Sequence, residues 1–282
     1  MSRSKFTFDP IFYFDLETTG INKDRCGIWQ LAYIIEEKGE ILKKRNLFMK
    51  PMYPLFCGNC KEMFRWDTHP YGEWVNKSCP ECGNGVLVDN IEPKAREIIN
   101  HLTFRDIVNG PNVVTPPEAY NTLVADIKEL TYEKWGKKYQ QKLYPAGYNI
   151  DSFDCDFLMK WFKDVNPEYK LVIGGGKVLD IEFFEYFYRN TVIDVKHVFI
   201  NTYRRLVKKG DLPLIENVKL ETVSKFLEEY IKKPLVKQAA GCSTHYHDAL
   251  YDVEITREVL LLCDEIERTG RLPGEAEDRY PA

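Results

Sequence analysis

Hydrophobic positions along the first fifty residues gather in runs of the length typical of β-strands, with polar turn residues between them. Three apolar runs occur there, at 11–14, 28–36 and 41–49. Turn residues at Gly20 and Lys38-Gly39 separate these runs, which predicts an antiparallel meander. Further along, apolar residues recur every three or four positions in six segments. Five of these predicted helices begin near residues 92, 116, 153, 220 and 249, and a long helical region follows residue 181 and extends to about residue 209.

Shorter apolar runs at 142–149, 171–173 and 178–181 lie among the predicted helices. Strands followed by interleaved helices and strands predict an α/β fold with a mixed sheet flanked by helices. Residues 51–91 differ in character, because they are rich in Cys, Gly, Asn and Pro and show little periodicity. We interpret this segment, the cysteine-rich insert, as an insertion into a discontinuous domain formed by residues 1–50 and 92–270. Residues 271–282 are predicted to be a flexible tail.

The cysteine-rich insert carries two Cys-x-x-Cys pairs, Cys57 with Cys60 and Cys79 with Cys82, with 18 residues between the pairs. This spacing is typical of four-thiolate zinc sites, in which two turns each supply two soft ligands. With four cysteines present, His69 is not expected to be a ligand. The sequence therefore predicts a zinc ribbon with one structural Zn²⁺, which lets a segment without a large core fold.

The role of the predicted ribbon is open at this stage. Five of its residues combine positive charge with aromatic surface: Arg65, Trp66, His69, Tyr71 and Trp74. Aromatic side chains can stack on unpaired bases. They can equally pack over the cysteine pairs and one another, or form a docking surface for a protein partner.

The charge balance limits how the chain can meet nucleic acid. With 39 basic and 43 acidic residues, the net charge of -4 argues against coating duplex DNA by bulk electrostatics. It is compatible with an enzyme whose acidic pocket holds cations. Basic clusters at 43–45, 204–205 and 208–209 carry little weight as phosphate tracks. No apolar run is long enough to span a bilayer, and the N-terminus lacks a signal peptide, so we expect a cytoplasmic protein without a membrane partner.

Acidic residues stand where a metal-dependent nuclease needs them. Asp15 and Glu17 follow the first apolar run and, being two apart on a strand, share one face. Asp154 lies in the first turn of a predicted helix, which we expect Asp151 to cap. Asp252 begins the last amphipathic helix. Two carboxylates side by side repel each other unless a cation lies between them.

Together with His247, these acids resemble the DEDDh exonucleases of the DnaQ-like 3′-to-5′ exonuclease superfamily. The motifs fall, in family order, on Asp15-x-Glu17, on Asn149 with Phe153-Asp154, and on His247-x-Ala249-x-x-Asp252. The gap of four residues between Asn149 and Asp154 is similar to that of family B polymerase proofreading domains. Residues 178–180 occupy the place of a core strand in that family, and 99–103 resemble its substrate-edge segment.

The resemblance implies a ribonuclease H-like sheet and hydrolysis from the 3′ ends of single-stranded or frayed nucleic acid, with DNA favoured slightly over RNA. Asp15, Glu17, Asp154 and Asp252 would hold two Mg²⁺ or Mn²⁺ ions, and His247 would act as general base. Substrate contacts are expected at Leu16, Thr18, Asn100, Asn149 and Phe153. The alternatives are an inert nucleic-acid-binding or scaffold protein that docks through the ribbon, and a zinc-ribbon regulator.

Overall fold

The computed structural model describes residues 9–99, 102–130, 142–173, 177–179, 182–188, 191–209, 212–236 and 248–270. Its centre is a six-stranded mixed sheet with the strand order β11-β8-β1-β2-β3-β7. Its strands are β1 (Ile11–Thr18), β2 (Ile28–Glu37), β3 (Glu40–Met49), β7 (Val113–Val114), β8 (Tyr144–Gly147) and β11 (Ile193–Asp194). The predicted antiparallel meander is confirmed, because β1 pairs with β2 and β2 with β3 in antiparallel register. The other three strands add in parallel to its two edges.

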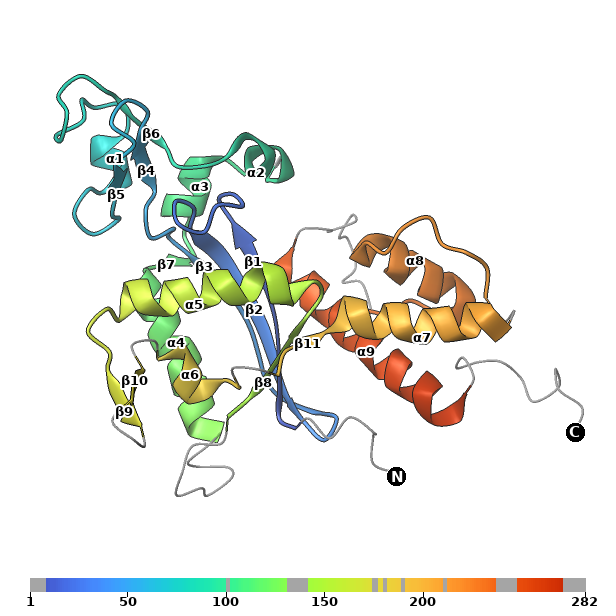
Figure 1. Cartoon of the computed structure of the whole chain (residues 1–282). Coiled ribbons are helices and arrows are strands. Elements are labelled where there is room, and N and C mark those ends of the chain that lie inside the picture. Colours follow the sequence, from blue (N-terminus) through green and yellow to red (C-terminus); the bar gives the residue numbers. More distant parts are fainter. Residues whose placement is uncertain are drawn as a thin grey trace, which may run out of the picture.

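Helices cover both faces of this sheet (Figure 1). One face is covered by α4 (Pro116–Lys128), α5 (Asp154–Val165) and α6 (Phe183–Tyr186), and the other by α7 (Val195–Lys209), α8 (Leu220–Ile231) and α9 (Ala249–Thr269). A short 3-10 turn, η2 (Ile150–Ser152), precedes α5. The predicted α/β class, with a mixed sheet flanked by helices, is confirmed.

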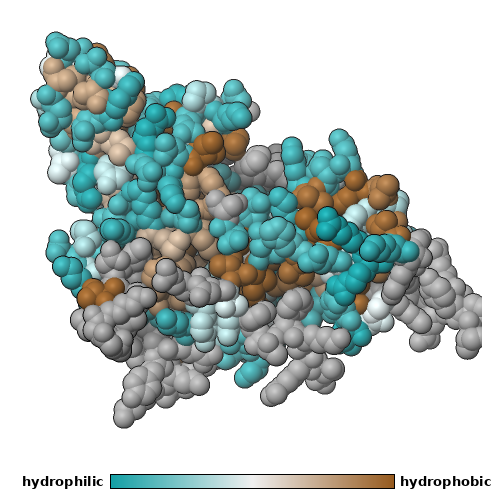
Figure 2. All heavy atoms as spheres, in the orientation of Figure 1, coloured by the Kyte–Doolittle hydropathy of each residue, from teal (hydrophilic) through white to brown (hydrophobic). Residues whose placement is uncertain are grey.

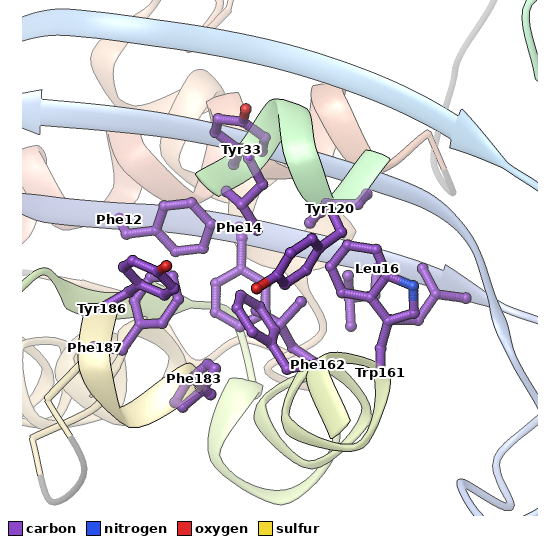
Figure 3. Close-up of a cluster of buried hydrophobic side chains, with 14 of the residues drawn as sticks. Phe12, Phe14, Leu16, Tyr33, Tyr120, Trp161, Phe162, Phe183, Tyr186 and Phe187 are labelled. Atoms are coloured by element: carbon purple, nitrogen blue, oxygen red, sulfur yellow. The ribbon is translucent and has the colours of Figure 1, made fainter. Parts of the chain in front are cut away.

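Strand β1 shows why the sheet has two cores. Its even-numbered residues, such as Phe12 and Phe14, pack against aromatic side chains from α5 and α6, as Figure 3 shows. Its odd-numbered residues, such as Tyr13, pack on the opposite face against α7 and α9. Because side chains alternate along a strand, Asp15 and Glu17 project from the same face as Tyr13, toward α9.

The cysteine-rich insert has its own three-stranded antiparallel sheet, in the order β5-β4-β6. Its elements are β4 (Leu55–Cys57), β5 (Met63–Phe64), α1 (Tyr71–Trp74) and β6 (Leu87–Asp89), and α2 (Pro93–Ile98) and α3 (Phe104–Asn109) follow it. Figure 1 shows α2 and α3 between this small sheet and the end of β1. A shared apolar cluster joins the insert to the main sheet through Trp29 of β2 and to α3 through Phe104.

One predicted core strand is wrong. Residues 177–179 form β10 (Lys177–Leu179), which pairs only with β9 (Leu171–Ile173) in a separate two-stranded sheet. The strand that completes the main sheet is β11, whose residues pair in parallel with β8. β11 is only two residues long, and it lies within the region up to residue 209 that the apolar spacing predicts to be helical. Asp180 lies outside the described residues.

Within the described ranges, no helix combines the length and the apolar character that crossing a membrane requires.

Candidate active site

The carboxyl end of β1 carries two of the predicted acids, and the register of its pairing with β2 shifts at this end. Asp15 lies opposite Ala32, and Glu17 lies opposite Gln30, but Thr18 shifts register and pairs with Ile28. Such β-bulges re-aim a strand and are frequent beside active sites. Past the bulge, Thr19 is tied to Gly27 by two hydrogen bonds, from its backbone N–H to the carbonyl (2.9 Å) and from the Gly27 N–H to its hydroxyl (3.0 Å). These bonds hold the acidic end of β1 in place.

Helix α9 brings a third acid to the same place. Asp252 lies in the first turn of α9, and one carboxylate oxygen each of Asp15, Glu17 and Asp252 lie within 4.8 Å of one another. All three side chains are half-buried. The structure therefore brings together acids from opposite ends of the chain. We call these three residues and Asp154 the acid cluster.

Asp154 reaches the acid cluster from the start of α5. Its buried carboxylate accepts hydrogen bonds from its own backbone N–H and from that of Leu16 in β1. The expectation that Asp151 caps this helix is wrong: Phe153 is the N-cap residue, and no side chain caps the helix. Asp151 lies in the turn η2 before the helix, and its side chain is exposed.

Burial and neighbouring negative charges raise the pKa values of three acids of the cluster, Asp15, Glu17 and Asp154. Burial is the largest cause for Asp15, followed by the charges of Asp154, Asp252 and Glu17, and the pKa of Asp15 lies well above its ordinary value. Burial and the charges of Asp252 and Asp154 raise the pKa of Glu17 to about 8. Burial likewise raises the pKa of Asp154 to about 7. The metal-free cluster is thus electrostatically unfavourable when it is fully ionised.

This donor set fits hard divalent cations. Carboxylate oxygens are the ligands that Mg²⁺, Mn²⁺ and Ca²⁺ prefer, and cations remove the repulsion that raises these pKa values. The spacing of the three oxygens within 4.8 Å suits ligands that share an ion.

Two residues that the sequence analysis gave no role support the cluster from behind. Asp248 caps α9 by accepting the N–H of Leu250 (3.0 Å), and its carboxylate also accepts the side-chain amide of Gln30 (3.1 Å). Gln30 is buried in β2 directly opposite Glu17 and donates to Asn46 as well (2.9 Å). An aspartate just before a periodic helix is a cap signal, and a lone polar residue in an apolar strand signals a buried hydrogen bond.

Asp194 of β11 is a further buried acid beside the site. Its charge raises the pKa of Asp154, after the larger effect of burial. It accepts the backbone N–H of Asn149 (3.3 Å), which stands in the left-handed conformation at φ 64°. The acid follows an apolar pair, Val192-Ile193, and this strand-end pattern was the signal that the sequence analysis did not use.

The predicted substrate contacts fall into different surroundings. The Leu16 side chain is buried in the core, so only its backbone faces the acid cluster. Thr18 donates its hydroxyl to the Gly20 carbonyl (2.8 Å). The side-chain oxygen of Asn149 accepts Lys196 (3.0 Å), and Phe153 packs on Phe157. Their contact with a substrate stays a prediction. Asn100 and His247 lie outside the described residues.

The four cysteines of the insert converge as a second candidate metal site. Their sulfur atoms lie within 4.8 Å of one another, with Cys57 Sγ 3.9 Å from Cys82 Sγ and Cys60 Sγ 3.7 Å from Cys79 Sγ. A tetrahedral ion with bonds of about 2.3 Å to sulfur has sulfur–sulfur edges of about 3.8 Å. Gly85 lies so close to the sulfurs that a side chain would not fit there, because a Cβ on Gly85 would lie 2.4 Å from Cys57 Sγ. The sulfurs are therefore spaced as ligands of one ion.

Hydrogen-bond donors around Cys82 favour its thiolate. The Asn59 amide donates to Cys82 Sγ (3.5 Å), and with the backbone N–H groups of Asn84 and Gly85 it lowers the pKa of Cys82 to about 6. His69 is not among the grouped ligands. Its ring instead lies 4.6 Å from the Trp74 ring, edge to face.

Comparison with known proteins addresses the fold. No family model matches the chain, and no curated protein matches it in sequence. A solved exonuclease I from Methylocaldum szegediense, described as moderately thermophilic, superposes with a TM-score of 0.53 over 93% of this chain at 17% identity. The zinc-ion-bound form of the E. coli exonuclease I complex with single-stranded DNA superposes with a TM-score of 0.50 over 94% of this chain at 13% identity.

The chain shares its fold with part of these exonuclease I structures. It spans about two fifths of those structures, covering 41% and 42% of their chains. At these identities the likeness concerns the fold alone, and the predicted ribonuclease H-like fold is confirmed. The roles of the individual site residues stay predictions.

Proposed function

We propose that this chain is a metal-dependent exonuclease that removes nucleotides from the 3′ end of single-stranded or frayed nucleic acid, with DNA preferred over RNA. The observation that carries the proposal is the convergence of Asp15, Glu17 and Asp252, with Asp154 beside them, at the end of β1. The exonuclease I fold supports it, since one of the superposed structures is a complex with single-stranded DNA.

In this proposal Asp15, Glu17, Asp154 and Asp252 bind two Mg²⁺ or Mn²⁺ ions. When bound, such ions supply an activated water and stabilise the charge on the leaving oxygen of the phosphodiester. The crowded carboxylates, whose pKa values are raised in the metal-free protein, are the groups that benefit most from cations.

The remaining chemistry belongs to the chain's own residues. His247 accepts, on an imidazole nitrogen, the proton that the attacking water releases, which suits a side chain whose ordinary pKa is near neutrality. Thr18 presents its backbone to the terminal nucleotide just beyond the bulge. Asp154, held by the Leu16 N–H, fixes the start of α5 against β1, so the acids on separate elements stay aligned.

We further propose that Cys57, Cys60, Cys79 and Cys82 hold one structural Zn²⁺, on the evidence of the sulfur spacing and the donors around Cys82. Four thiolates are a closed tetrahedral set, which leaves no open position for catalysis. The discontinuous domain organisation predicted from the sequence and a cytoplasmic location complete this proposal.

Hydrolysis of oligonucleotides labelled at the 5′ end tests the proposed function. With Mg²⁺ or Mn²⁺, the chain is expected to shorten single-stranded DNA into a ladder, and RNA more slowly. Asp15→Asn is expected to reduce the rate by about 10²–10³-fold or more, because it removes a charge that stabilises the transition state through the cations.

Asp156→Asn is the matched control, because Asp156 lies on the same helix as Asp154 but forms an exposed ion pair with Lys23. It is expected to cleave like the unchanged protein. Tight binding without any product, in both metals, would contradict the proposal and favour the scaffold alternative. Release of labelled mononucleotide in the first turnover would contradict the 3′-to-5′ direction.

A further inference from the structure

A cleft of about 560 Å³ lies between the cysteine-rich insert and the two helices that follow it. Val75 and Asn76, just after α1, and Val88 on β6 line the insert side. Arg96 on α2 and Arg105 on α3 line the opposite side. The volume falls in the range of small-ligand sites, about 300–1,000 Å³, so the cleft can hold a nucleotide-sized group.

The cleft has an excess of positive charge. Asp89, its acidic residue, accepts the Tyr71 hydroxyl (2.7 Å) on one oxygen and pairs with Arg96 (3.0 Å) on the other. Arg105 forms no hydrogen bond or ion pair with another side chain in the described ranges. One guanidinium is therefore neutralised and one is available, in the flat geometry that matches phosphate oxygens.

The other wall of the cleft is apolar and carries an amide. Val88 exposes 42% of its surface, although it lies in a β-strand. Asn76 stands in the left-handed conformation (φ 64°), and its backbone N–H donates to the Leu87 carbonyl (2.9 Å), which fixes its place beside Val88. Together these groups match a nucleotide within a strand. Val88 offers an apolar surface for the base, Asn76 an amide for the base edge and Arg105 a guanidinium for the phosphate.

The cleft is connected to the acid cluster through Glu92. The Glu92 backbone N–H donates to the Thr19 carbonyl (2.8 Å), and its carboxylate accepts the Ile21 N–H (3.0 Å). Arg96 lies one helical turn further, with its backbone N–H bonded to the Glu92 carbonyl (3.0 Å). From strand and helix rises, the backbone path from Glu17 to Arg96 is no more than about 20 Å, a distance that a single strand covers in a few nucleotides.

Other basic and aromatic groups suit this role less well. The basic run at 43–45 is paired, with Lys43 bonded to Glu129 (2.7 Å) and Arg45 to Asp126 (2.8 Å). Two aromatic contacts of the insert are internal to the fold, because His69 packs on Trp74 and Tyr71 packs on Phe104 of α3. Figure 2 shows that hydrophilic residues prevail on the visible surface where the insert meets the rest of the molecule.

We propose that this cleft binds a nucleotide of the substrate strand upstream of the terminal nucleotide, with Arg105 contacting its phosphate. The inference rests on the proposed function, because the strand in the cleft is the one whose 3′ end lies at the acid cluster. It gives the cysteine-rich insert a role in substrate binding through the junction it forms with α2 and α3, rather than through an aromatic surface of its own.

Binding and cleavage by Arg105→Ala test the cleft. The substrates are a single-stranded oligo-dT and the p-nitrophenyl ester of thymidine 5′-monophosphate, which is too short to reach the cleft. The ratio of kcat/KM for the oligonucleotide to that for the ester is expected to fall about 10-fold, the loss typical of one arginine contact to nucleic acid. The slope of oligonucleotide affinity against salt concentration, measured by fluorescence anisotropy with Ca²⁺ in place of Mg²⁺, is expected to decrease by about 1.

Two further variants accompany Arg105→Ala, of which the first is a control and the second is an independent test of the cleft. Arg65→Ala removes an arginine of the insert that is paired with Asp67 (3.1 Å) and lies outside the cleft, and it is expected to leave the ratio and the salt slope as they are. Val88→Glu, at an exposed position, places a carboxylate in the cleft and is expected to weaken oligonucleotide binding at least as much as Arg105→Ala.

Unchanged affinity and salt slope in both Arg105→Ala and Val88→Glu would overturn the inference, and a cleft that serves a protein partner would give that result. Failure of the proposed function is distinguishable. In that case no variant, nor the unchanged protein, hydrolyses the ester, while the anisotropy titration still reports whether the cleft holds a strand.

Discussion

The acid cluster and the cysteine cluster are two candidate metal sites built in opposite ways. The acids come from β1, α5 and α9, near the start, the middle and the end of the chain, and meet only when the main sheet has formed. The cysteines come from two turns within residues 57–82. Around the acids, burial and mutual repulsion raise pKa values. Around Cys82, hydrogen-bond donors lower the pKa of the thiol.

This difference separates the ways in which fold and metal depend on each other. The acid cluster is held by the fold, and its ionised form costs stability until cations bind. The cysteine cluster holds a segment with little core of its own, so there the metal contributes to folding. Removing a ligand is therefore expected to have opposite effects on stability at the two sites.

The largest effect on stability is expected at the cysteine site. Cys82→Ser removes one of four thiolates, and the loss of a structural metal is among the changes that cost about 3–5 kcal/mol or more. We expect the variant to contain less than one equivalent of zinc by mass spectrometry of the metal. Limited proteolysis is expected to cut it within residues 51–91, while the unchanged protein resists cleavage there.

Cys263→Ala is the matched control for that prediction, because it removes a buried cysteine from α9 without touching the cluster. It is expected to keep its zinc and its resistance to cleavage in the insert. Proteolysis spread evenly over the chain of Cys82→Ser would contradict the idea that the metal supports the insert locally.

The two sites also differed in how far the sequence could predict them. The cysteine cluster followed from spacing alone, since two Cys-x-x-Cys pairs in one short segment have few other arrangements. The acids could be placed only through family motifs, because nothing local says that Asp15 and Asp252 meet. The meander of β1 to β3 was predicted because turn residues separate three apolar runs of strand length.

What the sequence did not show was tertiary support. The hydrogen bonds from Gln30 to Asp248 and to Asn46 join residues of three separate segments, and no pattern along the chain encodes such a pairing. Strand β11 was missed because two residues show no period, and its place in the sheet depends on pairing with β8. The Asp151 cap failed because Asp151 lies in the turn η2 with an exposed side chain, and Phe153 takes the N-cap position.

A smaller effect is expected from the support behind the acid cluster. Gln30→Met keeps the size of the buried side chain but removes its hydrogen bond to the Asp248 carboxylate, which fixes the start of α9 and thus Asp252. Loss of such an outer contact typically costs about 10–100-fold in metal affinity or activity. We expect cleavage to require a higher Mn²⁺ concentration, with a partial recovery of rate at saturating metal.

Asn46→Ala tells the two partners of Gln30 apart, because it removes only the Asn46 contact and leaves the bond to Asp248. It is expected to change the Mn²⁺ requirement by less than Gln30→Met. If the two variants shift the requirement equally, Gln30 does not act through Asp248.

The smallest effect is expected on the stability of the metal-free protein. Folded Glu17 keeps its proton up to a pKa of about 8, whereas its ordinary pKa is 4.5, so the folded state binds more protons between these values and loses stability as pH rises through them. Glu17→Gln removes this charge from the crowded cluster and is expected to stabilise the protein in EDTA at pH 7.5 by about 1–2 kcal/mol. Urea unfolding at pH 5.5 and 7.5 measures the difference, which should be smaller at the lower pH.

Added Mg²⁺ should stabilise the unchanged protein more than the variant. Equal stability of both proteins in EDTA at both pH values would mean that the carboxylates do not repel one another in the folded state, and the electrostatic contrast between the acid cluster and Cys82 would then not hold.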